Sequence, residues 1–211
     1  MFREVPVLPV VIPLGAVILA VLVWRSSRAG RLTLPRAAVA LALAVYAAGV
    51  VANTVFPVFL DKPVSSAPWS AHLALVPFVD YEVADAATNV LVFVPLGVLV
   101  PLILTRVSWW RVVVAAAAFS LAIELTQLVT AHLLGGGHIA DVDDLIFNVV
   151  GGVLGFALYT WLSRVPALAT LLDRFRWSRP PEAQPSRRAR TKSTIPSAAA
   201  STSARQSSKS C

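Results

Sequence analysis

Long apolar runs dominate the chain and predict its architecture. A helix that crosses a membrane needs about 20 mostly apolar residues, because the hydrocarbon core is about 30 Å thick and a helix rises about 1.5 Å per residue. Five runs approach this length, and they cover residues 5–24, 37–60, 89–105, 112–134 and 145–162. Prolines in the first and third runs can kink or shorten a helix. The pattern predicts an all-α polytopic membrane helix bundle of about five transmembrane helices.

The composition agrees with this class. The 211 residues are 57% hydrophobic and only 14% charged, with a mean hydropathy of +0.73. A soluble domain is about 45–50% apolar and about 25% charged. The only cysteine is Cys211, so no internal disulfide can form. A soluble enzyme and a disulfide scaffold are therefore excluded.

The loops alternate in charge, and this predicts an orientation. Arginines gather between the first and second runs and between the third and fourth, whereas acidic residues gather in the two other loops. Lys and Arg concentrate in cytoplasmic loops. We therefore expect the N-terminus outside and the C-terminus in the cytoplasm.

The net charge of +7 comes from the end of the chain. Residues 174–211 hold nine Lys or Arg against one acid, and the rest is nearly neutral. Because the positive charge is confined to this segment, no nucleic-acid partner is expected. Residues 177–211 lack hydrophobic periodicity, which predicts a disordered basic cytoplasmic tail. It serves as a topology signal, or it attracts anionic lipid of the bilayer.

Polar residues inside the runs follow helical spacing. Ser120, Glu124 and Gln127 share one face of the fourth run, and Asn89, Phe93 and Gly97 share one face of the third. Around the start of the fifth run, a stripe with steps of three or four comprises His138, Asp141, Asp144, Asn148, Gly151 and Gly155. If one helix covers this stripe, Asp141 is a plausible N-cap, and the two glycines permit close backbone approach.

The helical rise also predicts depth. Glu124 lies about 18 Å above residue 112, and Asn148 lies about 10 Å below residue 141. The two side chains therefore reach a similar depth, and Gly97 is expected at the same level. We predict a polar pocket open to the extracytoplasmic side, with Glu124 near its floor and the aspartates at its rim.

Three segments resemble the VanZ-like family. They are residues 89–97, 120–127 and 141–155, and the likeness covers about residues 40–162. The resemblance implies a small multi-pass protein of the bacterial cytoplasmic membrane, whose founding relative is linked to low-level resistance to teicoplanin, a glycopeptide directed at cell-wall precursors. It supplies no reaction. Family members usually carry Arg where this chain has His138, which weakens the case for anion binding at the rim.

These patterns give a domain organisation and a set of candidate residues. We expect a first transmembrane helix and basic cytoplasmic loop (1–36), a VanZ-like membrane domain (37–165) and the tail (177–211). The candidate catalytic residues are Glu124 and Asp144. The candidate substrate-binding residues are Asn89, Gln127, His138, Asp141 and Asn148.

Each candidate has a structural alternative. Glu124 is a general acid or base, a head-group ligand, or a hydrogen-bonded residue that joins helices. Asp141 and Asp144 act in the site, or they are capping and loop acids. No metal-ligand spacing and no Gly-x-Ser-x-Gly elbow are present, so no metal, cofactor or serine nucleophile is expected.

The favoured function is action on an amphiphilic or lipid-linked cell-wall substrate at the outer leaflet. Two other kinds of function remain open. One is a membrane accessory or binding protein without catalysis, in which the polar residues only stabilise the bundle. The other is a small transporter, although no duplicated half is detectable. Whether the chain is an enzyme stays undecided by its sequence.

Overall fold

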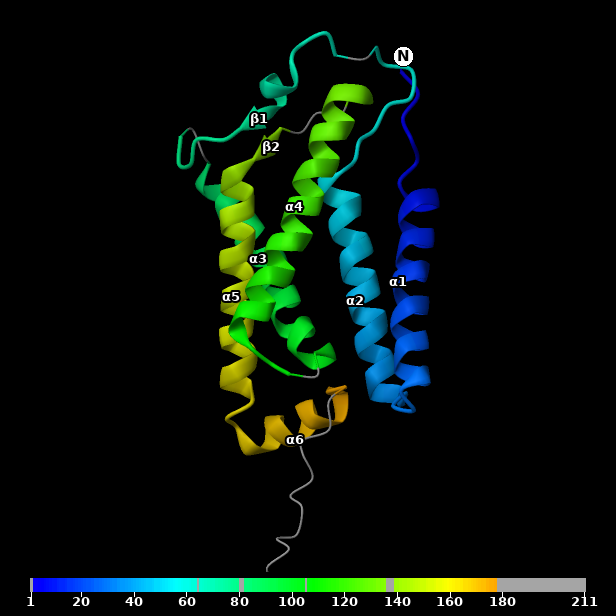
Figure 1. Ribbon diagram of the computed structural model, residues 1–211, viewed down its shortest axis with the longest axis vertical. Helices are drawn as coiled ribbons and strands as arrows, with labels where there is room; N and C mark the ends of the chain where they lie inside the picture. Colours follow the sequence, from blue (N-terminus) through cyan, green and yellow to red (C-terminus); the bar gives the residue numbers. More distant parts are fainter. Residues whose placement is uncertain (1, 64, 80–81, 105, 136–138, 178–211) are drawn as a thin grey trace, which may run out of the picture. The chain divides into compact units, whose positions relative to one another are not determined.

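The fold is a helical bundle (Figure 1). The computed structural model describes residues 2–63, 65–79, 82–104, 106–135 and 139–177. The helices in these ranges are α1 (Leu8–Arg28), α2 (Leu34–Thr54), α3 (Val83–Ile103), α4 (Trp109–Leu133), α5 (Val142–Leu162) and α6 (Pro166–Phe175), with a short 3-10 helix, η1 (Trp69–His72). The five longer helices, α1 to α5, are long and apolar enough to cross a membrane. The predicted all-α bundle with five spans is confirmed, and it indicates embedding in a lipid bilayer. The orientation stays a prediction, and residues 178–211 of the predicted tail lie outside the described ranges.

Two helix boundaries differ from the predicted runs by six residues, more than any other boundary. Helix α2 ends at Thr54, six residues before the apolar run ends, and Pro57 follows closely. Helix α3 begins at Val83, six residues before its apolar run, with Asp85 in the first turn. An acid is favourable there because the helix N-terminus carries a partial positive charge. Hydropathy alone misses such polar helical turns.

Helix α6 was not predicted. Pro166 lies in its first turn, where a missing N–H costs no helical hydrogen bond. Figure 1 shows α6 crossing the end of the bundle where α2 begins. Its Leu172 and Phe175 pack against the buried cluster that consists of Val39, Leu102 and Tyr159. The helix is only 10 residues long, too short for a search based on membrane-spanning runs.

Helices α3 and α5 are in backbone contact through glycines. A Cβ on Gly97 would overlap the carbonyl oxygen of Gly152 and lie 2.8 Å from Cα of Gly155. A Cβ on Gly151 would likewise overlap the carbonyl oxygen of Val90. The predicted close approach at Gly151 and Gly155 is confirmed.

One predicted depth is wrong. Gly97 packs against Gly152, which is four residues beyond Asn148 in α5. Four residues correspond to about one helical turn. Gly97 therefore lies about one turn deeper than Asn148 and serves helix packing.

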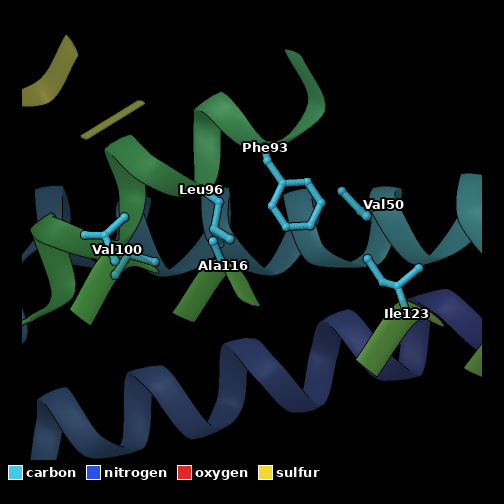
Figure 2. Close-up of a cluster of buried hydrophobic side chains, with 7 residues drawn as sticks. Val50, Phe93, Leu96, Val100, Ala116 and Ile123 are labelled. Carbon is cyan, nitrogen blue, oxygen red and sulfur yellow. The ribbon is translucent and has the colours of Figure 1, made fainter. Parts of the chain in front are cut away.

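The hydrophobic core lies among α2, α3 and α4. Figure 2 shows Phe93 of α3 with Val50 of α2 on one side and the α4 residue Ile123 nearby. The buried cluster consists of Val50, Phe93, Leu96, Val100, Val112, Ala116 and Ile123. These side chains fix the spacing of α2, α3 and α4, and the last two of these helices carry the candidates Asn89, Glu124 and Gln127.

Two short strands connect loops that are distant in sequence. Strand β1 (Leu73–Ala74) pairs in parallel with β2 (Ala140–Asp141), with Ala74 opposite Asp141. The Asp141 side chain accepts a hydrogen bond of 2.8 Å from the Asp143 backbone N, which confirms the predicted N-cap. Because Asp141 lies in a strand and α5 begins only at Val142, the predicted polar stripe does not run along one helix from residue 138.

Candidate functional site

A cavity of about 690 Å³ lies among α2, α3, α4 and α5. Its lining residues come from all four helices, and they are Tyr46, Gly49, Val50, Asn53, Thr54, Asp85, Thr88, Asn89, Val92, Phe93, Pro95, Ile123, Glu124, Gln127, Asp144 and Asn148. The sequence candidates Asn89, Glu124, Gln127, Asp144 and Asn148 are thus brought together. Candidate Asp141 is not among the lining residues but donates its backbone N–H to Glu124, and candidate His138 lies outside the described residues.

The cavity has a polar end and an apolar end. On α2 the lining changes from Tyr46 and Val50 to Asn53 and Thr54 towards the helix C-terminus. These residues span about 12 Å along the helix, since each residue rises about 1.5 Å. The polar end is therefore at the end of the bundle where α2 ends and where α3 and α5 begin. A cavity of this kind suits an amphiphilic molecule.

Glu124 is a buried carboxylate at the polar end. Its side chain is only 7% exposed. Its Oε2 accepts a hydrogen bond of 2.9 Å from the Asp141 backbone N, which connects α4 to the start of α5. Within the described ranges, no hydrogen bond to its Oε1 is found, and both Asp141 and Asp144 are near enough to interact with it electrostatically. Glu124 thus has one oxygen occupied by the fold and one available to a ligand.

Asn89 of α3 and Asp144 of α5 form a direct pair. The Asn89 Nδ2 donates a hydrogen bond to Asp144 Oδ1. Asp85, one helical turn before Asn89, lines the same cavity. Among the described residues, the salt bridges are Arg3–Asp61 and Arg176–Asp173, so neither involves a cavity carboxylate. The cavity is accordingly acidic.

Two buried amides leave their oxygens free. Gln127 Nε2 donates to the carbonyl oxygen of Thr54 at 2.8 Å, and Asn148 Nδ2 donates to Ser120 Oγ at 2.9 Å. In the described part of the chain, Gln127 Oε1 and Asn148 Oδ1 are buried without a hydrogen-bond partner. Leaving a buried acceptor unsatisfied costs about 1–3 kcal/mol. Such atoms call for a donor that the described residues do not provide.

The available polar atoms of the site are therefore mainly acceptors. Carboxylates accept hydrogen bonds when ionised, and the two amide oxygens accept them in any state. The arrangement fits hydroxyl, amine or amide groups better than a phosphate. Across the ranges that the structure covers, no group of three or more His, Cys, Asp or Glu residues is placed to hold a metal ion.

Two further acidic residues matter at this site, although neither is among the candidates from the sequence. Asp143 is 4% exposed, and both its oxygens lie 3.0 Å from the Phe78 backbone N, which donates to the carboxylate. It falls outside the polar stripe, so nothing in its spacing marks it. Asp85, by contrast, precedes Asn89 by one helical turn, and that spacing does carry a signal.

One family model matches the part of the chain that forms the cavity. The VanZ/LLP1 family model matches residues 43–163. The match begins within α2 and ends just after α5, so it includes every residue that lines the cavity. No curated protein and no solved structure matches the chain. Since the family model covers more than half of the sequence, the chain belongs to the VanZ/LLP1 family.

Proposed function

We propose that the protein acts at the bacterial cell envelope on an amphiphilic or lipid-linked substrate, whose head group occupies the polar end of the cavity. The observation that carries this proposal is the set of acceptors gathered there. Glu124 Oε1, Gln127 Oε1 and Asn148 Oδ1 have no partner among the described residues. A head group rich in hydroxyl or amino groups supplies the missing donors.

The apolar end of the cavity holds the hydrophobic part of the substrate. Val50, Val92 and Phe93 line this end. The Tyr46 hydroxyl donates to the carbonyl oxygen of Val92 at 3.0 Å and bridges α2 and α3. Beside them, a Cβ on Gly49 has no atom within 4 Å, so space for a chain is open along α2. Burial of apolar surface then contributes to affinity.

Each polar candidate has a distinct role in this proposal. Glu124 contacts the head group or moves a proton as a general acid or base, because one of its oxygens remains available. Asp144 is fixed by Asn89 and positions the head group. Gln127 and Asn148 accept hydrogen bonds from it. Asp141 holds Glu124 in place through its backbone N–H.

The predicted orientation places the polar end at the outer leaflet. That end carries the acidic loops, which precede α3 and α5. Substrates of cell-wall assembly are accessible on that side of the cytoplasmic membrane. This location agrees with the link between the VanZ family and glycopeptide resistance.

Antibiotic susceptibility tests the proposal. Wild type, Glu124→Gln, Asp144→Asn and the control Asp61→Asn are expressed at equal membrane abundance in a sensitive host. Asp61 is 58% exposed and outside the cavity, so its variant changes charge without touching the site. We expect protection against teicoplanin rather than vancomycin from wild type and Asp61→Asn, and loss of protection in both site variants. Protection retained by both site variants would overturn the proposed role of the cavity.

A non-catalytic binding function is the second candidate, and Glu124 separates the two. Its Oε2 contact to Asp141 N persists with the amide oxygen of Gln, whereas proton transfer does not. If Glu124→Gln retains binding of the substrate yet loses protection, proton chemistry is required. If it retains both, the protein is a binding or accessory protein. Transport is less favoured because the cavity lining ends at Tyr46 and Pro95, in the middle parts of α2 and α3.

A further inference from the structure

A second cavity lies at the opposite end of the bundle. Its volume is about 250 Å³, and its walls come from the end of α1, the loop to α2, the end of α3 and Trp177 after α6. It shares no lining residue with the first cavity. A cavity volume of about 10–15 Å³ is enough for one water molecule. A cavity of about 250 Å³ therefore accommodates a larger group.

The mouth of this cavity is positively charged. Arg25 and Arg31 line it. In the parts of the chain that the structure describes, neither arginine has an acidic partner, and the ion pair at this end, Arg176–Asp173, is internal to the α6 region. Two guanidinium groups without counter-ions beside one cavity attract an anion.

Two residues that line this cavity carry buried donors without acceptors. Ser26 is only 2% exposed, and its Oγ is buried without a hydrogen-bond partner in the described part of the chain. Trp177 Nε1 is likewise buried without a hydrogen-bond partner among the described residues. An indole N–H can only donate, so Trp177 Nε1 needs an acceptor that the described residues do not supply. Both residues line the cavity.

The backbone around the cavity is held in place. The Trp177 backbone N donates to the carbonyl oxygen of Leu102 at 2.8 Å, which joins the segment after α6 to α3. Arg36 Nε donates to the carbonyl oxygen of Arg176 at 2.8 Å, and its Nη1 donates to the carbonyl oxygen of Arg31 at 2.7 Å. The backbone segments that carry Arg31 and Trp177 are thus held in place.

We infer that this cavity binds a phosphate group, with Arg25 and Arg31 neutralising its charge and Ser26 Oγ and Trp177 Nε1 donating hydrogen bonds. Leu22 and Leu104 form apolar walls next to these donors. The cavity lies where α1 and α3 end, the level at which a membrane protein meets lipid head groups. A phospholipid therefore fits the site better than free phosphate, since its glycerol and acyl carbons contact the apolar walls.

Lipid binding by the full chain tests this inference. Native mass spectrometry in neutral detergent measures binding of phosphatidylglycerol to wild type, to the double variant Arg25→Gln/Arg31→Gln, and to the control Arg106→Gln/Arg111→Gln. The control removes the same charge from the loop between α3 and α4 and from the first turn of α4, outside the cavity. We expect at least tenfold weaker binding in the cavity variant and less than twofold change in the control. Equal weakening in both would overturn the site, because it would indicate general surface attraction.

Two milder variants keep the test informative if the double variant folds poorly. Trp177→Phe removes only the N–H of the ring, and Ser26→Ala removes only the hydroxyl. Each is expected to weaken phosphatidylglycerol binding by threefold or more with unchanged helix content, and unchanged binding in both contradicts the inference. Inorganic phosphate, compared with chloride at equal ionic strength, distinguishes the sources. If millimolar phosphate displaces the lipid, free phosphate is also a ligand of this cavity. If it does not, the phospholipid is the ligand.

Discussion

Gly97 of α3 and Gly155 of α5 bring two helix backbones into contact. A Cβ on Gly97 would lie 2.8 Å from Cα of Gly155, and a Cβ on Gly155 would lie 2.9 Å from Cα of Gly97. Small residues permit such approach between membrane helices, where dispersion contacts replace the hydrophobic effect as the driving force. The same contact fixes Asn89 and Asp144, which come from these two helices, at the polar end of the cavity.

Replacing Gly97 with Ala should therefore destabilise the protein. The new methyl group meets backbone atoms, which cannot rotate away, so we expect a loss of about 1–3 kcal/mol. Unfolding by increasing SDS in mixed micelles measures it. Gly49→Ala is the matched control, because nothing lies within 4 Å of its Cβ. A Gly97→Ala variant as stable as the control would show that the helices separate without cost.

Filling the first cavity should abolish function and leave the fold intact. Gly49 lines the cavity and has open space at the position of a Cβ, so Gly49→Phe projects a ring into that space. The replacement also removes a helical glycine, which is unfavourable by about 0.5–1 kcal/mol relative to Ala. We expect unchanged thermal stability and loss of protection against teicoplanin. Val45→Phe adds comparable bulk to α2 where the side chain is 63% exposed, and it should retain protection. Equal protection by both variants would contradict a role for the cavity.

The pair formed by Asn89 and Asp144 should contribute coupling energy. A double-mutant cycle with Asn89→Ala and Asp144→Ala isolates it from the separate effects of each residue. We expect about 1 kcal/mol, the scale typical of hydrogen bonds between membrane helices. Unfolding in mixed micelles again supplies the free energies. Strict additivity of the two single variants would mean that the pair forms without stabilising the bundle.

Asp143 should anchor the segment before α3. Its carboxylate accepts the backbone N–H of Phe78, so Asp143→Ala removes the acceptor and frees this stretch. Hydrogen exchange at residues 75–79 should become about tenfold faster, which corresponds to about 1.4 kcal/mol. Asp61→Ala, at an exposed site, is expected to leave that exchange unchanged. Unchanged exchange in Asp143→Ala would show that other contacts retain the segment.

Cysteine labelling checks the predicted orientation. In a Cys211→Ser background, Asp61→Cys should react with a membrane-impermeant maleimide on intact cells, whereas Arg106→Cys should react only after permeabilisation. The acidic loop that contains Asp61 and the basic loop that contains Arg106 lie at opposite ends of α3. The reverse pattern would place the polar end of the first cavity in the cytoplasm and remove the outer-leaflet proposal.

The sequence was informative wherever a single helix carries the signal. The five spans follow from apolar length, and the N-cap at Asp141 follows from its position before α5. Helical spacing also placed Gln127 and Glu124 on one face, and both line the cavity. These features depend on periodicity and on membrane thickness, which act along the chain and require no knowledge of neighbouring helices.

What the sequence determined by itself is thus the class of protein, its spans and the set of buried polar side chains. Only the tertiary structure decided which of them meet: Asn89 with Asp144, Gln127 with Thr54, and the backbone N of Asp141 with Glu124. In the tertiary structure Gly97 also lies one turn deeper than predicted, and the Asp143 carboxylate accepts a hydrogen bond from the Phe78 backbone N. The physical reason is that the axial shift and rotation of one helix against another depend on packing between side chains far apart in sequence, and no repeat along one helix encodes them.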